Sequence, residues 1–213
     1  MRSNNGGVAK VCGSFLYLGS LTDNKGSSGP EIRRRIKKAS ETFRRLWRVW
    51  AMKGLPLKLK GRLYSAFVHS AFLCNSEVWT ITGTEMKALE GRNGYLMRRL
   101  IGEVVRSADD KRLTESQLLE MLGLETIEAL IRKRKLQWVA HCARRGNGDL
   151  TWRRMVREAE DGKSKWGIKL KEEWKELGVD TVRGWCNKVK DRCWLASKLG
   201  GGRGKGKKKT NGR

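Results

Sequence analysis

The chain has few acidic residues for its length. Its 213 residues include 22 Asp and Glu against 47 Lys and Arg, which gives a formal net charge of +25. Such an excess of positive charge predicts an anionic partner. RNA, DNA or an RNA/DNA hybrid fits best, because each phosphate that Lys or Arg neutralises releases condensed counterions. A membrane surface is the weaker candidate.

Long apolar runs and regularly spaced cysteines are also missing. No stretch approaches the roughly 20 apolar residues that a membrane span needs, and residues 1–7 lack the apolar core of a secretory signal. The five cysteines are odd in number and scattered, which favours reduced thiols over a disulfide framework. We therefore expect a soluble intracellular protein with no membrane partner.

The spacing of apolar residues predicts a mainly α-helical fold. A short strand is expected at residues 15–18, and a helix then starts at Pro30 and continues past Trp50. A second helix follows Pro56, and a third runs from a capping box at Thr82 to Gly102. The expected inward face of the second helix comprises Leu59, Leu63, Ala66, Phe67, Ser70, Ala71 and Cys74.

The second half of the chain is also expected to be helical. Thr114 caps a short helix that Gly123 closes, and a longer helix covers residues 126–145. Two or three amphipathic helices follow in residues 149–198, and the last stretch, 198–213, has seven basic residues and no acidic one. That tail is expected to be disordered. The expected core anchors of the later helices are Trp152, Trp174, Trp185 and Trp194.

Two of the predicted helices have a strongly basic face. A run of charge is usually only a solvated surface, but here the excess recurs on two helices and in the tail, which favours phosphate contact. Trp47, Trp50 and Trp138 fall on the apolar faces of these helices, so we expect them in the core rather than stacked on bases. The predicted phosphate ligands are Arg33, Arg34, Lys37, Lys38, Arg44, Arg45, Arg132, Lys133, Arg134 and Lys135.

Several short motifs occur in a recognisable order. They are FLYLGS at 15–20, EIRRRI at 31–36, Leu46, LKLKGRLY at 57–64, SEVWT at 76–80, MRRLIG at 97–102, IRKRKLQW at 131–138, His141, and Asp191, Arg192 and Trp194. In this order they resemble the carboxy-terminal part of the reverse transcriptase of a non-LTR (LINE-type) retrotransposon. The resemblance implies that Tyr17, Leu18 and Gly19 help to position a primer strand in a full-length enzyme, and that helices beyond them form a thumb.

The resemblance also implies a division of the chain. Residues 1–29 would be a palm-end remnant and turn, and residues 30–105 a thumb-like helical bundle. Residues 106–197 would be a C-terminal helical region, followed by the basic tail at 198–213.

Catalytic residues are not expected in this chain. Reverse transcriptases hold two magnesium ions with palm aspartates, and the family's fingers and most of its palm would precede residue 1. Asp109 and Asp110 follow Ala108 as in a catalytic turn, but Arg106 and Lys111 flank them where apolar strands are required, so an interhelix loop is expected. No cysteine pair has the spacing of a zinc site. We expect no metal or cofactor here, and magnesium only in a full-length enzyme.

Three functions remain open from the sequence. The first is binding of nucleic acid without a polymerase site. The second is a thumb that acts in trans with a separate catalytic polymerase chain, and the third is a degenerate or protein-interaction remnant. The basic tail is equally compatible with a nuclear localisation signal, a phosphate clamp or random downstream sequence, and we expect a nuclear location.

Overall fold

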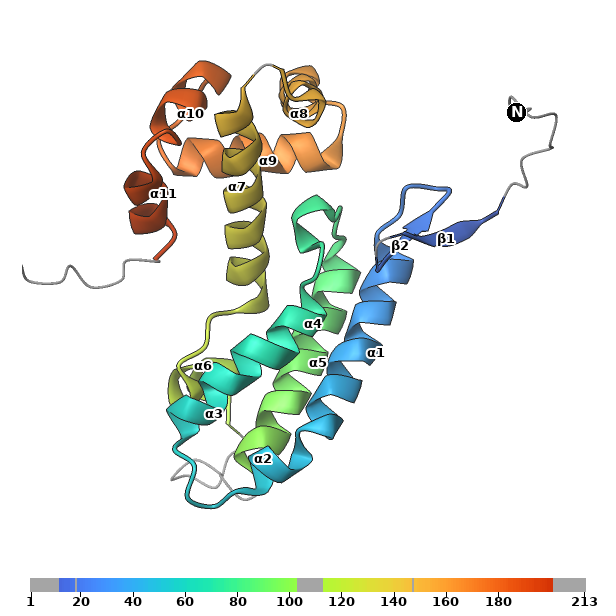
Figure 1. The fold of residues 1–213 in the computed structure, drawn as a ribbon, viewed down its shortest axis with the longest axis vertical. Helices are drawn as coiled ribbons and strands as arrows, with labels where there is room; N and C mark the ends of the chain where they lie inside the picture. The colour runs from blue at the N-terminus through green and yellow to red at the C-terminus, as the bar shows by residue number, and fades with distance from the viewer. Residues whose placement is uncertain (1–11, 18, 103–112, 147, 201–213) are drawn as a thin grey trace, which may run out of the picture. The chain divides into compact units, whose positions relative to one another are not determined.

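The protein is mainly α-helical, as the sequence predicts, with one small antiparallel sheet (Figure 1). A computed structural model describes residues 12–17, 19–102, 113–146 and 148–200. The chain divides into two compact units, Met1–Ile131 and Arg132–Arg213. This division lies within helix α7 (Ile127–Arg145), whereas the resemblance implied a boundary near residue 105. Residues 201–213 of the predicted tail lie outside the described residues.

The first unit begins with a hairpin. Strands β1 (Ser14–Tyr17) and β2 (Ser20–Asp23) pair antiparallel, with Tyr17 opposite Ser20. Gly19 makes the turn with φ of +78°, a conformation that favours glycine. The side chains of β1 are exposed.

A bundle of helices follows the hairpin (Figure 1). It comprises α1 (Gly29–Arg45), α2 (Trp47–Ala51), α3 (Leu57–Tyr64), a π-helical turn (Ser65–His69), α4 (Ser70–Phe72), a 3-10 turn (Ser76–Val78), α5 (Gly83–Ile101) and α6 (Glu115–Leu122). The expected capping box at Thr82 is confirmed, and Thr114 forms another with Gln117. Gly123, with φ of +64°, ends α6 as expected.

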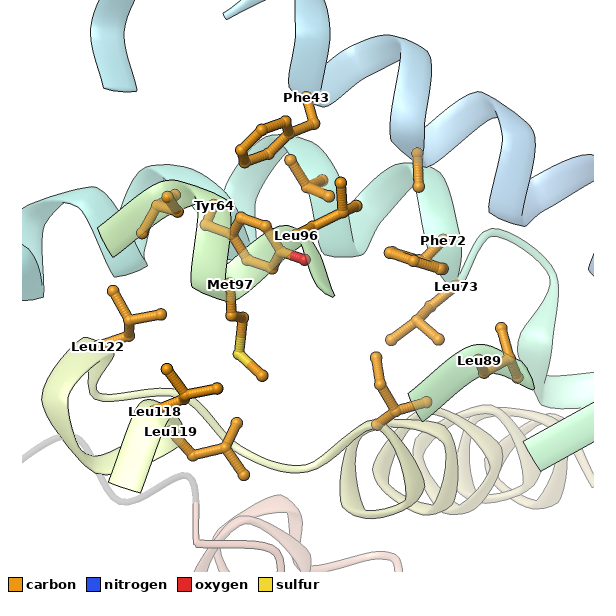
Figure 2. Packing of buried hydrophobic residues seen from close by; sticks show 14 of the residues in the cluster. Phe43, Tyr64, Phe72, Leu73, Leu89, Leu96, Met97, Leu118, Leu119 and Leu122 are labelled. Atoms are coloured by element: carbon orange, nitrogen blue, oxygen red, sulfur yellow. The ribbon is translucent and has the colours of Figure 1, made fainter. Parts of the chain in front are cut away.

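The core of this unit is built mainly from the inward sides of α1, α3, α4, α5 and α6 (Figure 2). Tyr64, Phe72, Leu89 and Met97 are fully buried. The close packing of α3 on α6 depends on Gly61, because a Cβ there would lie 1.9 Å from the Leu122 carbonyl oxygen. This contact joins α6 to the preceding helices and so extends the first unit beyond residue 105.

The predicted inward face of the second helix is only partly confirmed: Leu63 and Ala71 pack against the core, but other members of the face do not. Phe67 is 50% exposed and Leu59 is 40% exposed, whereas Tyr64 and Val68 are fully buried. Both faces of this sequence are apolar, and the structure buries the one that carries Tyr64 and Phe72. The π-helical turn at Ser65–His69 adds a residue to one turn and shifts the face that follows. Of the predicted set, the exposed members are Leu59, Ala66, Phe67 and Ser70.

The first helix also differs from its prediction, because it ends at Arg45 and the chain turns at Leu46. The break leaves Trp47 61% exposed, so the expectation that it lies in the core is wrong. Trp50 is buried instead, stacks on Phe43 with ring centroids 5.4 Å apart, and donates its indole N–H to the Phe43 carbonyl oxygen at 2.9 Å. A regular helix would direct the Trp47 amide to that carbonyl.

The second unit contains the rest of α7 with α8 (Leu150–Asp161), α9 (Lys165–Glu176), α10 (Val182–Lys188) and α11 (Arg192–Lys198). Trp152, Trp174 and Trp185 are buried as predicted, and Trp194 packs against them half-buried. Trp174 stacks on Trp185 with centroids 5.2 Å apart. Large aromatic side chains therefore supply much of the apolar area that holds these short helices together.

Candidate nucleic-acid interface

The exposed side of α1 is mostly basic, with one acidic residue, Glu41, in the middle of it. The chain rotates by about 100° per residue in an α-helix, so the six predicted phosphate ligands of this helix fall within an arc of about 140°. Ile32, Ala39 and Phe43 lie on the opposite side and are buried. Helical spacing therefore separates most of the charge on α1 from the core, although Glu31 and Arg35 are buried. Five of the six side chains are exposed, namely Arg33, Lys37, Lys38, Arg44 and Arg45.

These five cations lack an ion-pair partner among the residues that the structure describes. Their charge is therefore directed to solvent, where an anion can reach it. We call these five residues the α1 basic face.

Arg34, the sixth predicted ligand, has a structural contact. Its Nε lies 2.8 Å from a Glu31 carboxylate oxygen, and its guanidinium also donates to the Gly19 carbonyl oxygen. The Arg34 side chain is 27% exposed. Its charge is thus shared with Glu31, and its contribution to phosphate contact is smaller than the sequence alone indicates.

Glu31 joins the hairpin to α1. Its carboxylate accepts hydrogen bonds from the Leu21 amide at 2.9 Å and from Arg35 Nε at 2.6 Å, in addition to Arg34. Arg35 also donates to the Gly19 carbonyl oxygen at 2.6 Å. Burial alone would raise the pKa of Glu31, but the hydrogen bonds from Arg34, Leu21 and Arg35 outweigh it and hold the pKa below its ordinary value.

The contacts among Glu31, Arg34 and Arg35 were not predicted from the sequence, although the spacing of these residues indicates them. Glu31 stands alone among basic residues at the first turn of the helix, three and four residues before Arg34 and Arg35. That spacing places both guanidinium groups on the carboxylate. The contact to Gly19 could not be inferred, since it depends on where the hairpin folds back.

The predicted primer-positioning residues lie in this hairpin. Tyr17 ends β1 with its side chain 63% exposed. Gly19 uses its carbonyl oxygen for Arg34 and Arg35. Leu18 lies outside the described residues.

The basic run on α7 is less open than predicted. Arg132 pairs with Glu176 at 2.5 Å, and Lys133 and Arg134 are half-buried and also have partners. Lys135 is 3% exposed, and its Nζ lies 3.1 Å from a Glu173 carboxylate oxygen that is equally buried. Burial lowers the pKa of Lys135 and raises the pKa of Glu173. Lys135 therefore belongs to the core of the second unit and is not available to a phosphate.

The second unit has an exposed basic surface elsewhere, on α8, which sequence reasoning missed. Arg153, Arg154 and Arg157 are exposed opposite the buried Trp152 and Met155, and they line a hollow of about 510 Å³. Glu158 and Asp161 share the hollow, and Arg154 pairs with Glu158 at 3.1 Å. This surface is therefore of mixed charge, unlike the α1 basic face.

The two histidines and the cysteines do not gather around a metal. Among the residues that the structure describes, no group of three His, Cys, Asp or Glu side chains is placed to hold an ion. His69 lies in the core of the first unit, where its Nε2 is 3.2 Å from the Asn93 side-chain oxygen that also accepts from Tyr64 at 2.8 Å. Burial raises the pKa of Tyr64. Asp109 and Asp110 lie outside the described residues.

Nor does any helix in the described ranges have the length and apolar character of a membrane span.

A comparison with known proteins identifies one informative relative. The chain is 26% identical over 195 residues to an uncharacterised transposon-derived protein of Caenorhabditis elegans, a match that covers 85% of this chain and 68% of the relative. The similarity marks the chain as transposon-related. No family model matches it, and no solved structure matches it.

Proposed function

We propose that this chain binds nucleic acid through phosphate contacts, as the thumb-containing part of a retrotransposon reverse transcriptase that carries no polymerase site of its own. The observation that carries the proposal is the α1 basic face: five exposed cations on one side of a helix, none paired with a carboxylate within the described residues. The transposon-derived relative supports a role of this kind. Contact to phosphates without base readout predicts little sequence preference.

The proposal is tested by the salt dependence of binding to a primer–template RNA/DNA hybrid. Each phosphate that loses a contact should reduce the slope of log affinity against log salt by about 0.9. We expect the variant Arg33→Glu, Lys37→Glu, Lys38→Glu, Arg44→Glu to bind more weakly and to flatten the slope by up to about 3.6.

A matched control carries the same change of net charge in the second unit, where Lys165, Lys171, Lys175 and Arg183 are exposed. Replacing these four by Glu should leave the slope nearly unchanged. Equal effects of the two variants would show that only overall charge matters and would contradict a role for α1. Absence of binding at low salt would contradict the nucleic-acid function altogether.

Action in trans with a catalytic chain is a second candidate, which the exposed strand β1 favours. Phe15, Leu16 and Tyr17 are 51%, 62% and 63% exposed, and among the described residues only β2 pairs with β1. A strand with an unpaired edge and apolar side chains is suited to pairing with a further strand. In either case the chain alone should show no magnesium-dependent primer extension in the same preparation. Extension by the chain alone would contradict both candidates.

A further inference from the structure

A second feature of the first unit adds to the α1 basic face. Where α1 breaks at Leu46, the following residues and the end of α5 line an open hollow of about 590 Å³. This volume lies within the range of sites that hold small organic ligands. Its lining combines aromatic side chains, among them Trp47 and Trp50, with the basic residues Lys53, Lys60 and Arg99.

Trp47 gives this hollow a stacking surface. Its side chain is 61% exposed, although tryptophan is among the residues whose burial contributes most to a core. The Arg48 guanidinium lies 5.8 Å from the centroid of the Trp47 ring, so a cation accompanies the exposed indole. An exposed indole beside cations is the arrangement on which unpaired bases stack.

The charge of the lining is of one sign. None of the described residues that line the hollow is acidic. Lys60 is only 8% exposed, and its Nζ donates to the Trp50 carbonyl oxygen at 2.7 Å. No carboxylate of the described residues forms an ion pair with Lys60. An anion that entered the hollow would stabilise a buried ammonium in these surroundings.

We infer that the hollow binds an unpaired nucleotide, with the base stacked on Trp47 and the phosphate near Lys53 and Lys60. The inference rests on the proposed function and deepens it, because the α1 basic face would hold the duplex while this hollow takes a nucleotide from its single-stranded end. The hollow would recognise a flat base joined to a phosphate. An unpaired nucleotide at a strand end and a free mononucleotide both have these two groups.

The test compares a blunt hybrid duplex with a duplex of equal phosphate number that ends in a short single-stranded overhang. One stacked base should make the overhang duplex bind about tenfold more tightly. Trp47→Ala should abolish this advantage, and Trp47→Phe should retain part of it. Phe67→Ala is the matched control, since Phe67 is 50% exposed and does not line the hollow; this variant should keep the full advantage.

Fluorescence provides a second readout. The overhang should quench the tryptophan fluorescence of the wild-type chain more than that of Trp47→Phe. The difference in quenching between the two reports on Trp47 alone among the nine tryptophans. Equal quenching by the mononucleotide, with no overhang advantage, would assign the hollow to free nucleotides. An overhang advantage unchanged in Trp47→Ala, with helicity intact by circular dichroism, would overturn the inference. Equal affinity for the blunt and the overhang duplex would also overturn the inference, but it would leave the proposed function standing. If neither duplex bound, the proposed function itself would be contradicted.

Discussion

Glu31 links the hairpin to α1. Its side chain is 3% exposed and accepts from Arg34, Arg35 and the Leu21 amide. Replacing it by Gln leaves two guanidinium groups without their carboxylate, so we expect Glu31→Gln to lower the free energy of unfolding by about 3 kcal/mol. Urea unfolding followed by circular dichroism measures the change. Glu41→Gln, a change of the same kind on the same helix, should have little effect because Glu41 forms no ion pair with a described residue.

The stabilisation that Glu31 provides should depend on pH, and the direction of that dependence can be measured. The pKa of Glu31 is depressed in the folded chain, so its stabilisation is present above its ordinary pKa of 4.5 and is lost as pH falls through the lower folded value. The difference in stability between wild type and Glu31→Gln should therefore shrink below about pH 4. A difference that stays constant from pH 7 to pH 3 would argue against the ionic contact.

At the scale of elements, the contact between α3 and α6 depends on the absence of a side chain. A Cβ on Gly61 would lie 1.9 Å from the Leu122 carbonyl oxygen, and backbone cannot yield as a flexible side chain does. We expect Gly61→Ala to destabilise the first unit by about 2 kcal/mol despite the better helix propensity of alanine. Gly91→Ala in α5 is the matched control: its Cβ meets no atom within 4 Å, so it should stabilise by about 0.5 to 1 kcal/mol. A similar increase in the free energy of unfolding for Gly61→Ala and Gly91→Ala would contradict the close packing at Gly61.

At the scale of the whole molecule, the two units have separate hydrophobic cores. Leu89 belongs to the core of the first and Leu170 to that of the second, and both are fully buried. Truncation of a buried leucine lowers the free energy of unfolding by about 2 to 5 kcal/mol. The loss should be confined to the unit in which that leucine lies. We expect Leu170→Ala to increase amide hydrogen exchange in residues 132–200 and Leu89→Ala in residues 12–131. Loss of protection in both units from either variant would show that they unfold as one.

The local chemistry of the sequence was sufficient to predict the class of fold and many helix ends. The capping box at Thr82, the cap at Thr114 and the stop at Gly123 each depend on a few neighbouring residues, and all three are confirmed. The position of the five exposed cations opposite the core residues of α1 also followed from helical spacing, which is a local property of the sequence.

The tertiary structure decided which of two chemically similar sides is buried. Trp47 and Trp50 have the same side chain, and only the turn at Leu46 places one against Phe43 and the other in solvent. Lys135 and Arg134 are adjacent basic residues, but only Lys135 is buried against Glu173. Residues far along the chain, such as Leu122 for Gly61, set these outcomes. Sequence periodicity describes a helix by itself, whereas burial depends on which elements come to lie against it.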